Sequence, residues 1–181
     1  MRPLFIALLL CLTGFTLRAQ HSLWMSPALG IGFDKGGILG HADIGLSYLH
    51  NNRFGFTGGV FANGRDGISA SELKHPVKSY SGGTLQAIIN VFPYEETQSK
   101  LLFRAGLCYG TGYYYQWNEG VSGPTSGYYT SKYYQTIAGE LSLEFLFNHK
   151  PNRAWGFQFY GMLQRHAFVG ITLRYAFGVF N

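Results

Sequence analysis

Charged residues are scarce in this 181-residue chain: they make up 13% of it, about half the share in a typical soluble domain. The 14 basic and nine acidic residues are scattered without a basic run, so we expect no nucleic-acid partner. Cysteine is nearly absent as well. Only Cys108 lies beyond residue 20, so an intramolecular disulfide framework is excluded.

Long apolar runs are also missing after residue 20. The first twenty residues, MRPLFIALLLCLTGFTLRAQ, place Arg2 before an apolar run from Leu4 to Leu17, which is typical of a secretory signal peptide and too short for a spanning helix. We predict cleavage after Gln20. Residues 21–181 then form one domain with twelve basic and nine acidic residues, a net charge of +3.

What the chain does contain is aromatic residues, at 17%, and 25 glycines. An exported, charge-poor, aromatic-rich and glycine-rich chain without a spanning helix is typical of a transmembrane β-barrel, whose apolar residues occupy every second strand position. Eight alternating segments separated by turn-forming residues support this interpretation. They cover 23–33, 38–49, 54–63, 79–92, 101–117, 134–147, 154–164 and 167–179.

The two faces of these segments differ in kind. One face carries bulky apolar residues, and the other carries small residues, many of them glycine. The charges within the predicted strand cores all fall on the small face: Asp43, Arg104, Glu140, Glu144 and Arg174. An eight-stranded barrel leaves room only for side chains in its lumen. We therefore predict that the charged face points inward and the apolar face toward lipid. The alternative is a soluble lipocalin-like barrel with the faces reversed.

The last strand, VGITLRYAFGVF, alternates strictly and is rich in aromatic residues. With the signal peptide and the eight segments, it makes the chain resemble the small eight-stranded outer-membrane barrels of Gram-negative bacteria, the OmpA/OmpX-like group. One departure is that Asn181 follows Phe180, where that family usually ends on phenylalanine. The resemblance implies a closed antiparallel barrel in the outer membrane, in contact with lipid and lipopolysaccharide.

The five inward charges form a candidate lumen network, because isolated buried charges are too costly to keep. We expect paired charges that fill and rigidify the barrel, with Arg104 near Glu140 or Glu144. The alternative is a proton or ion path.

A catalytic role has little support in the residues. Some barrels of similar build modify lipid A with histidine, serine and an acid, and His41, Asp43 and Ser47 share one predicted face. However, His41 and Ser47 are about 20 Å apart along a strand, so they cannot form a nucleophile–base pair. No pair of histidine or cysteine residues has metal-ligand spacing, and no glycine motif suits a phosphate. We therefore predict no catalytic residues, metal, cofactor or small-molecule substrate.

Tyrosines gather in one part of the chain. A spanning strand needs about 9–11 residues, so 111–117 and 128–135 should continue past the membrane as a hairpin joined by a loop at 118–127. Its aromatic residues form either an interface girdle alone or a girdle with a binding surface. They are Tyr113, Tyr114, Tyr115, Trp117, Tyr128, Tyr129, Tyr133 and Tyr134.

The function predicted from these patterns is that of a non-enzymatic outer-membrane barrel that binds a partner through this hairpin or stabilises the envelope. Two alternatives remain. One is an accessory subunit of a larger envelope complex for secretion or conjugation, and the other is a lipid A-modifying enzyme.

Overall fold

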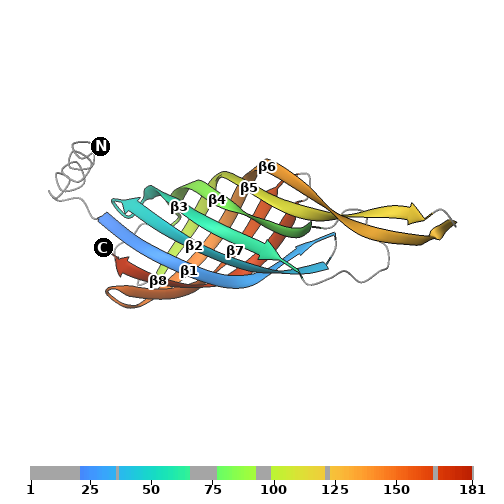
Figure 1. Ribbon diagram of the computed structural model, residues 1–181. Coiled ribbons are helices and arrows are strands. Elements are labelled where there is room, and N and C mark those ends of the chain that lie inside the picture. Colours follow the sequence, from blue (N-terminus) through green and yellow to red (C-terminus); the bar gives the residue numbers. More distant parts are fainter. Residues whose placement is uncertain are drawn as a thin grey trace, which may run out of the picture.

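The computed structural model describes residues 21–35, 37–65, 77–92, 99–120, 123–164 and 167–180, and they form one closed β-barrel (Figure 1). Each strand pairs antiparallel with the next, and β8 pairs with β1 to close the barrel. The strands are β1 (His21–Asp34), β2 (Gly37–His50), β3 (Phe54–Gly64), β4 (Val77–Asn90), β5 (Ser99–Gly120), β6 (Gly123–Lys150), β7 (Arg153–Leu163) and β8 (Phe168–Val179). The predicted fold class is confirmed. The predicted signal peptide, residues 1–20, lies outside the described residues.

No helix among the described residues is long and apolar enough to cross a membrane.

The two faces of the sheet point as the alternation predicts. Leu29 is 71% exposed on the outside, whereas its neighbour Ala28 is 4% exposed on the inside. The same contrast holds on β8, where Leu173 is 65% exposed and Arg174 is 4% exposed. A soluble barrel would bury its bulky apolar residues, so the lipocalin-like alternative is wrong. The apolar exterior is a lipid-facing band of the kind found on outer-membrane barrels.

Apolar side chains fill both ends of the lumen. We name the two clusters for the orientation that we predict, with the N-terminus in the periplasm. The outer cluster lies toward the β5–β6 hairpin, and the periplasmic cluster lies toward the start of β1 and the end of β8. The outer cluster contains Leu39, Phe61, Val77, Tyr80, Cys108, Ala138, Tyr160, Met162 and Phe168. The periplasmic cluster contains Trp24, Leu49, Ile88, Leu102, Leu146, Ala154 and Ala176. The five charged residues of the predicted lumen network lie between these two apolar clusters.

Inward glycines make room for the large rings of the outer cluster. A Cβ at Gly110 would lie 2.7 Å from the Tyr80 ring, and a Cβ at Gly32 would lie 2.9 Å from the Tyr160 hydroxyl. Both distances are shorter than real Cβ contacts, so each tyrosine occupies space that an alanine would take.

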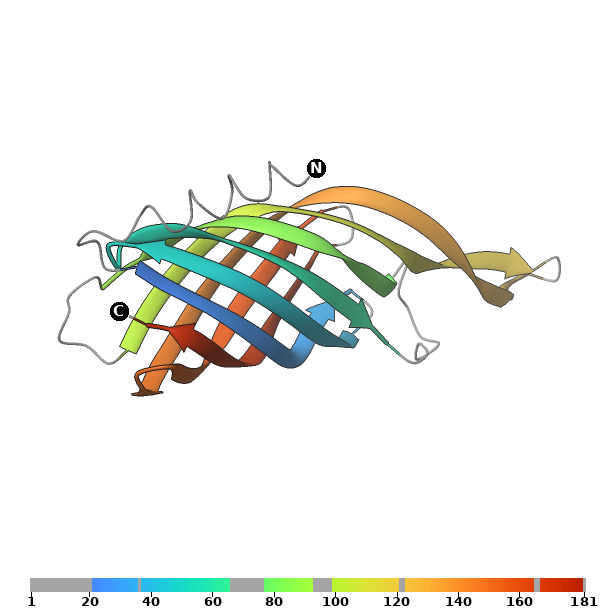
Figure 2. The ribbon, with the colours of Figure 1, turned by 60° about the vertical axis from the view of Figure 1, so that its left-hand side comes forward.

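The strands differ greatly in length. β3 and β7 have 11 residues each, close to the 9–11 that a bilayer requires, whereas β5 has 22 and β6 has 28. Figures 1 and 2 show the excess as a twisted two-stranded ribbon that extends beyond the barrel.

The prediction of a loop over 118–127 is wrong. β5 continues to Gly120 and β6 begins at Gly123, with Glu119 still opposite Gly127. Pairing between the two strands overrides the turn-forming composition of NEGVSGPTSG, because strand formation depends strongly on the partner strand.

Candidate functional site: the lumen network and the outer hairpin

The centre of the lumen holds a fully buried ion pair between neighbouring strands. Arg104 on β5 is 1% exposed, and its Nη2 donates to Glu144 Oε2 on β6, where Glu144 is 0% exposed. The register places Arg104 opposite Ser142 and Leu102 opposite Glu144, so the pair is diagonal. Diagonal neighbours on one face of a sheet are within reach of long side chains such as arginine.

Arg174 connects five strands. Its Nη2 donates to both carboxylate oxygens of Asp43 on β2, at 2.7 and 2.8 Å. Its Nη1 donates to Ser26 Oγ on β1 at 3.0 Å, and its Nε donates to Gln158 Oε1 on β7 at 3.0 Å. The same Nε lies 3.4 Å from Glu144 Oε1 on β6. Such multidentate contacts offset the desolvation cost of a buried guanidinium.

His41 extends the network toward the outer cluster. Its Nε2 lies 2.9 Å from Asp43 Oδ2, and its Nδ1 lies 2.7 Å from Asn63 Oδ1. These two contacts link the Asp43 carboxylate, which Arg174 also binds, to Asn63 on β3. The Tyr160 ring packs against His41 with centroids 4.4 Å apart.

Glu140 is the member of the predicted set that stands apart. Its Oε2 accepts a hydrogen bond of 2.6 Å from Thr84 Oγ1 on β4, whereas Arg104 contacts Glu144. The structure thus brings Asp43, Arg104, Glu144 and Arg174 into one set of ion pairs and places Glu140 beside it.

Little open space remains around these groups. The cavity lined by His41, Asp43, Arg104, Glu140 and Arg174 has a volume of about 20 Å³, enough for roughly one water molecule. Apolar clusters also fill both ends of the lumen. A cavity this small between two apolar clusters favours a packed interior over a proton or ion path.

The residues considered for catalysis lie in separate contacts. Ser47 Oγ lies 2.7 Å from Thr57 Oγ1, and His41 contacts Asp43 and Asn63. Among the described residues, no hydrogen bond joins a serine to His41. The geometry therefore gives the lipid A-modifying alternative no support, since a nucleophile must lie within reach of its base.

Sequence reasoning missed two further buried polar contacts. Arg65, directly after β3, forms an ion pair with Asp34 at the end of β1, and Asp34 Oδ2 accepts a 2.8 Å hydrogen bond from the Val77 backbone N–H. Near the other end, Lys100 Nζ donates to Asn52 Oδ1 in the turn after β2. Both pairs involve strand ends or turns, where period-two alternation carries no signal.

The extended hairpin has two faces, set by the β5–β6 register. Tyr113 is opposite Tyr133 and Tyr114 is opposite Lys132. Because side chains alternate along a strand, Tyr114 and Tyr134 continue the lumen face, and Tyr113, Tyr115 and Tyr133 continue the outer face.

The lumen-face tyrosines close the barrel. Tyr134 stacks on Tyr80 with centroids 5.6 Å apart and an interplanar angle of 12°, and it packs against the outer apolar cluster. Tyr114 contacts Tyr134 at 5.9 Å. Tyr134 thus packs in the closure of the lumen, because its position in the alternation turns it inward.

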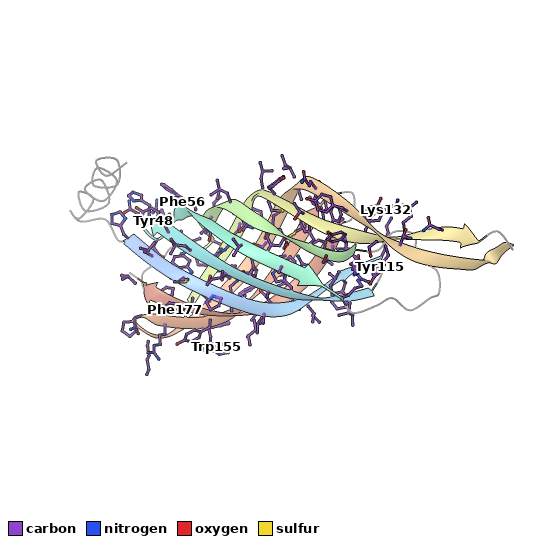
Figure 3. The ribbon with its side chains drawn as sticks, in the orientation of Figure 1. Tyr48, Phe56, Tyr115, Lys132, Trp155 and Phe177 are labelled. Carbon is purple, nitrogen blue, oxygen red and sulfur yellow. The ribbon has the colours of Figure 1, made fainter. Side chains whose placement is uncertain are left out.

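The outer-face tyrosines are open. Tyr113 is 46% exposed and Tyr133 is 54% exposed, and their rings meet edge to face at 5.6 Å. Lys78 Nζ lies 5.4 Å from the centre of the Tyr115 ring, a cation–π contact, and donates to Ser131 Oγ at 3.3 Å. Figure 3 labels Tyr115 near the base of the hairpin. Trp117 is the register partner of Tyr129. The side chains of Trp117, Tyr128 and Tyr129 lie outside what the structure describes.

Comparison with protein-family models and with curated protein sequences gives no match. Solved structures do match. Ail, the attachment invasion locus protein of Yersinia pestis, in complex with the heparin analogue sucrose octasulfate, is 15% identical with a TM-score of 0.54, over 91% of this chain and 100% of that one. The N-terminal β-barrel domain of Pseudomonas aeruginosa OprF is 12% identical with a TM-score of 0.57, over 89% and 99%. Neisserial surface protein A is 12% identical with a TM-score of 0.55, over 90% and 99%.

The chain has the fold of the small outer-membrane barrels. The TM-scores and the coverage of these matches show the fold, and the exposed apolar band suits a lipid environment. The resemblance predicted from the sequence and the predicted outer-membrane location are thereby confirmed.

Proposed function

We propose that this outer-membrane barrel is a non-enzymatic surface protein that binds a protein partner through the outer face of the β5–β6 hairpin. The observation that supports this most is the length of the hairpin. Pairing of β4 with β5 ends at Tyr114, and pairing of β6 with β7 ends at Gly139. Beyond these residues, β5 and β6 pair only with each other within the described part of the chain. Spanning the bilayer requires none of this excess.

The chemistry of the outer face suits a partner. Tyrosine offers a large contact area and few rotamers, so ordering it on binding costs little entropy. The outward Tyr113, Tyr115 and Tyr133 form a row of such rings, and the unpaired strand edges can accept an added strand. The Ail structure contains a bound heparin analogue, which supports ligand binding by a barrel of this fold.

The test compares two sets of tyrosines on the same hairpin. Substituting Tyr113, Tyr115 and Tyr133 by alanine should abolish capture of the partner in pull-downs from detergent-solubilised membranes and leave barrel stability unchanged. The matched control, Tyr134→Ala, should lower stability and leave capture intact. If the outer-face substitutions lower stability and change no captured protein, the tyrosines form a girdle only.

The register provides a second variant. Trp117 and Tyr129 are directly opposite, so replacing 118–128 with Asn-Gly should join them by a two-residue type I′ turn. This shortened barrel should still insert, as judged by heat-modifiable migration on gels, and should lose capture. The identity of the proteins that the wild type captures tests the accessory-subunit alternative, because subunits of a secretion or conjugation complex differ from a surface receptor. The mass of lipid A from a deletion strain tests the enzyme alternative, and we expect it to be unchanged.

A further inference from the structure

Two histidines face each other at the periplasmic end of the barrel. His21 begins β1 and His50 ends β2, and they are direct register partners. Their ring centroids lie 5.2 Å apart. Directly opposed residues on antiparallel strands project from the same face. Their neighbours Ser22 and Leu49 are buried in the lumen, so the alternation turns both histidines to the outer side of the barrel. Figure 3 labels Tyr48, which contacts His21, at this end.

The separation of the rings suits a shared metal ion. A transition metal binds an imidazole nitrogen at about 2.0–2.1 Å, which places each ring centroid about 3 Å from the metal. Two rings that bind one ion therefore have centroids roughly 4–6 Å apart. The observed 5.2 Å lies within this range before any side chain rotates.

A third nitrogen donor comes from the predicted processing of the chain. The described residues contain no group of three His, Cys, Asp or Glu side chains that could hold a metal, so two imidazoles alone would make an incomplete site. Cleavage after Gln20 makes His21 the first residue and creates an α-amine on it. That amine and the Nδ1 of the same residue can close a six-membered chelate ring around a metal.

We propose that the processed barrel binds one Cu²⁺ ion through the α-amine and ring of His21 and the ring of His50. Three nitrogen donors favour Cu²⁺, which also forms the most stable complexes among the divalent first-row metals. The Tyr48 hydroxyl now lies 2.8 Å from His21 Nδ1. On binding, that nitrogen exchanges the hydroxyl contact for the metal, and the α-amine releases its proton.

Aromatic side chains next to His21 and His50 can hold the two histidine rings in position for a metal. His21 stacks on Tyr48 at 5.7 Å, and His50 contacts Phe54 at 5.7 Å. Tyr48 in turn contacts Phe56 at 5.4 Å, so aromatic rings restrict the motion of both ligands. Outer groups that fix a histidine ring strengthen its metal binding.

The first experiment determines the mass of the exported, tag-free protein purified from outer membranes, followed by calorimetric titration with CuCl₂ in detergent. We expect a chain that begins at His21, one Cu²⁺ bound per chain, and an electron paramagnetic resonance spectrum with nitrogen couplings. A chain that begins at another residue would overturn the proposal.

Variants then separate this site from the other histidines. His50→Gln should weaken Cu²⁺ binding by at least about 10–100-fold, the loss that even an outer-shell substitution produces. A refolded chain with Gly-Ser-Ser-Gly ahead of His21 keeps both rings but moves the amine away, and it should weaken binding similarly. His149→Gln, at the same end of the barrel, is the matched control and should bind as the wild type does. Equal affinity in all variants would show that the cluster is an aromatic girdle only.

Discussion

Removal of Arg104 tests the lumen network most directly. Arg104→Met deletes the charge while keeping a long side chain. Glu144, which is 0% exposed, would then keep only Arg174, whose Nε lies 3.4 Å away. Breaking a buried pair by removing one partner costs about 3–5 kcal/mol, so we expect a loss of that size in the free energy of unfolding.

The double variant provides the internal comparison. Arg104→Met combined with Glu144→Gln removes one positive and one negative charge, and Arg174 keeps both oxygens of Asp43. Replacing both members of a buried pair is often nearly neutral, so the double variant should lie within about 1–2 kcal/mol of the wild type. Removing Glu144 alone should also cost about 3–5 kcal/mol, so the double-mutant cycle should give a coupling energy of at least about 4 kcal/mol.

Urea titration of the barrel in lipid vesicles, followed by tryptophan fluorescence, measures these differences. Lys132→Met removes an exposed charge from the hairpin and should change stability by no more than about 0.5 kcal/mol. A cost below about 1 kcal/mol for Arg104→Met, or a double variant that costs the sum of the two singles, would refute the reasoning.

Four further substitutions test the fold. Leu143→Arg places a charge on the lipid face and should cost about 2–4 kcal/mol, whereas Ser142→Arg overfills the lumen; lipid accessibility of a spin label at each position checks the assignment of faces. Gly110→Ala should cost about 1–3 kcal/mol in urea titrations because its Cβ meets the Tyr80 ring at 2.7 Å, and a wild-type midpoint would contradict that packing. Asp34→Ala removes the buried ion pair at the outer end and should make whole cells more sensitive to surface proteolysis; unchanged sensitivity would mean that the pair does not fasten that end.

The alternation of side chains carries most of the fold, because a period of two follows from strand geometry alone. It predicts eight strands and assigns Leu29 and Leu173 to the outside and Arg104 and Arg174 to the inside. This assignment requires no knowledge of which strand lies next to which. Because the alternation is fixed, it also assigns the inward charges to one face without reference to the contacts between them.

Only the tertiary structure decides which side chains meet. Arg174 contacts Asp43, 131 residues away, because closure of β8 on β1 brings the two ends of the chain together. The register of β5 and β6 turns Tyr134 inward and Tyr133 outward, and it continues the strands through a segment whose composition predicts a loop. Pairing depends on the partner strand as much as on the local residues, so the contact between His21 and His50 also exists only once the first hairpin has formed.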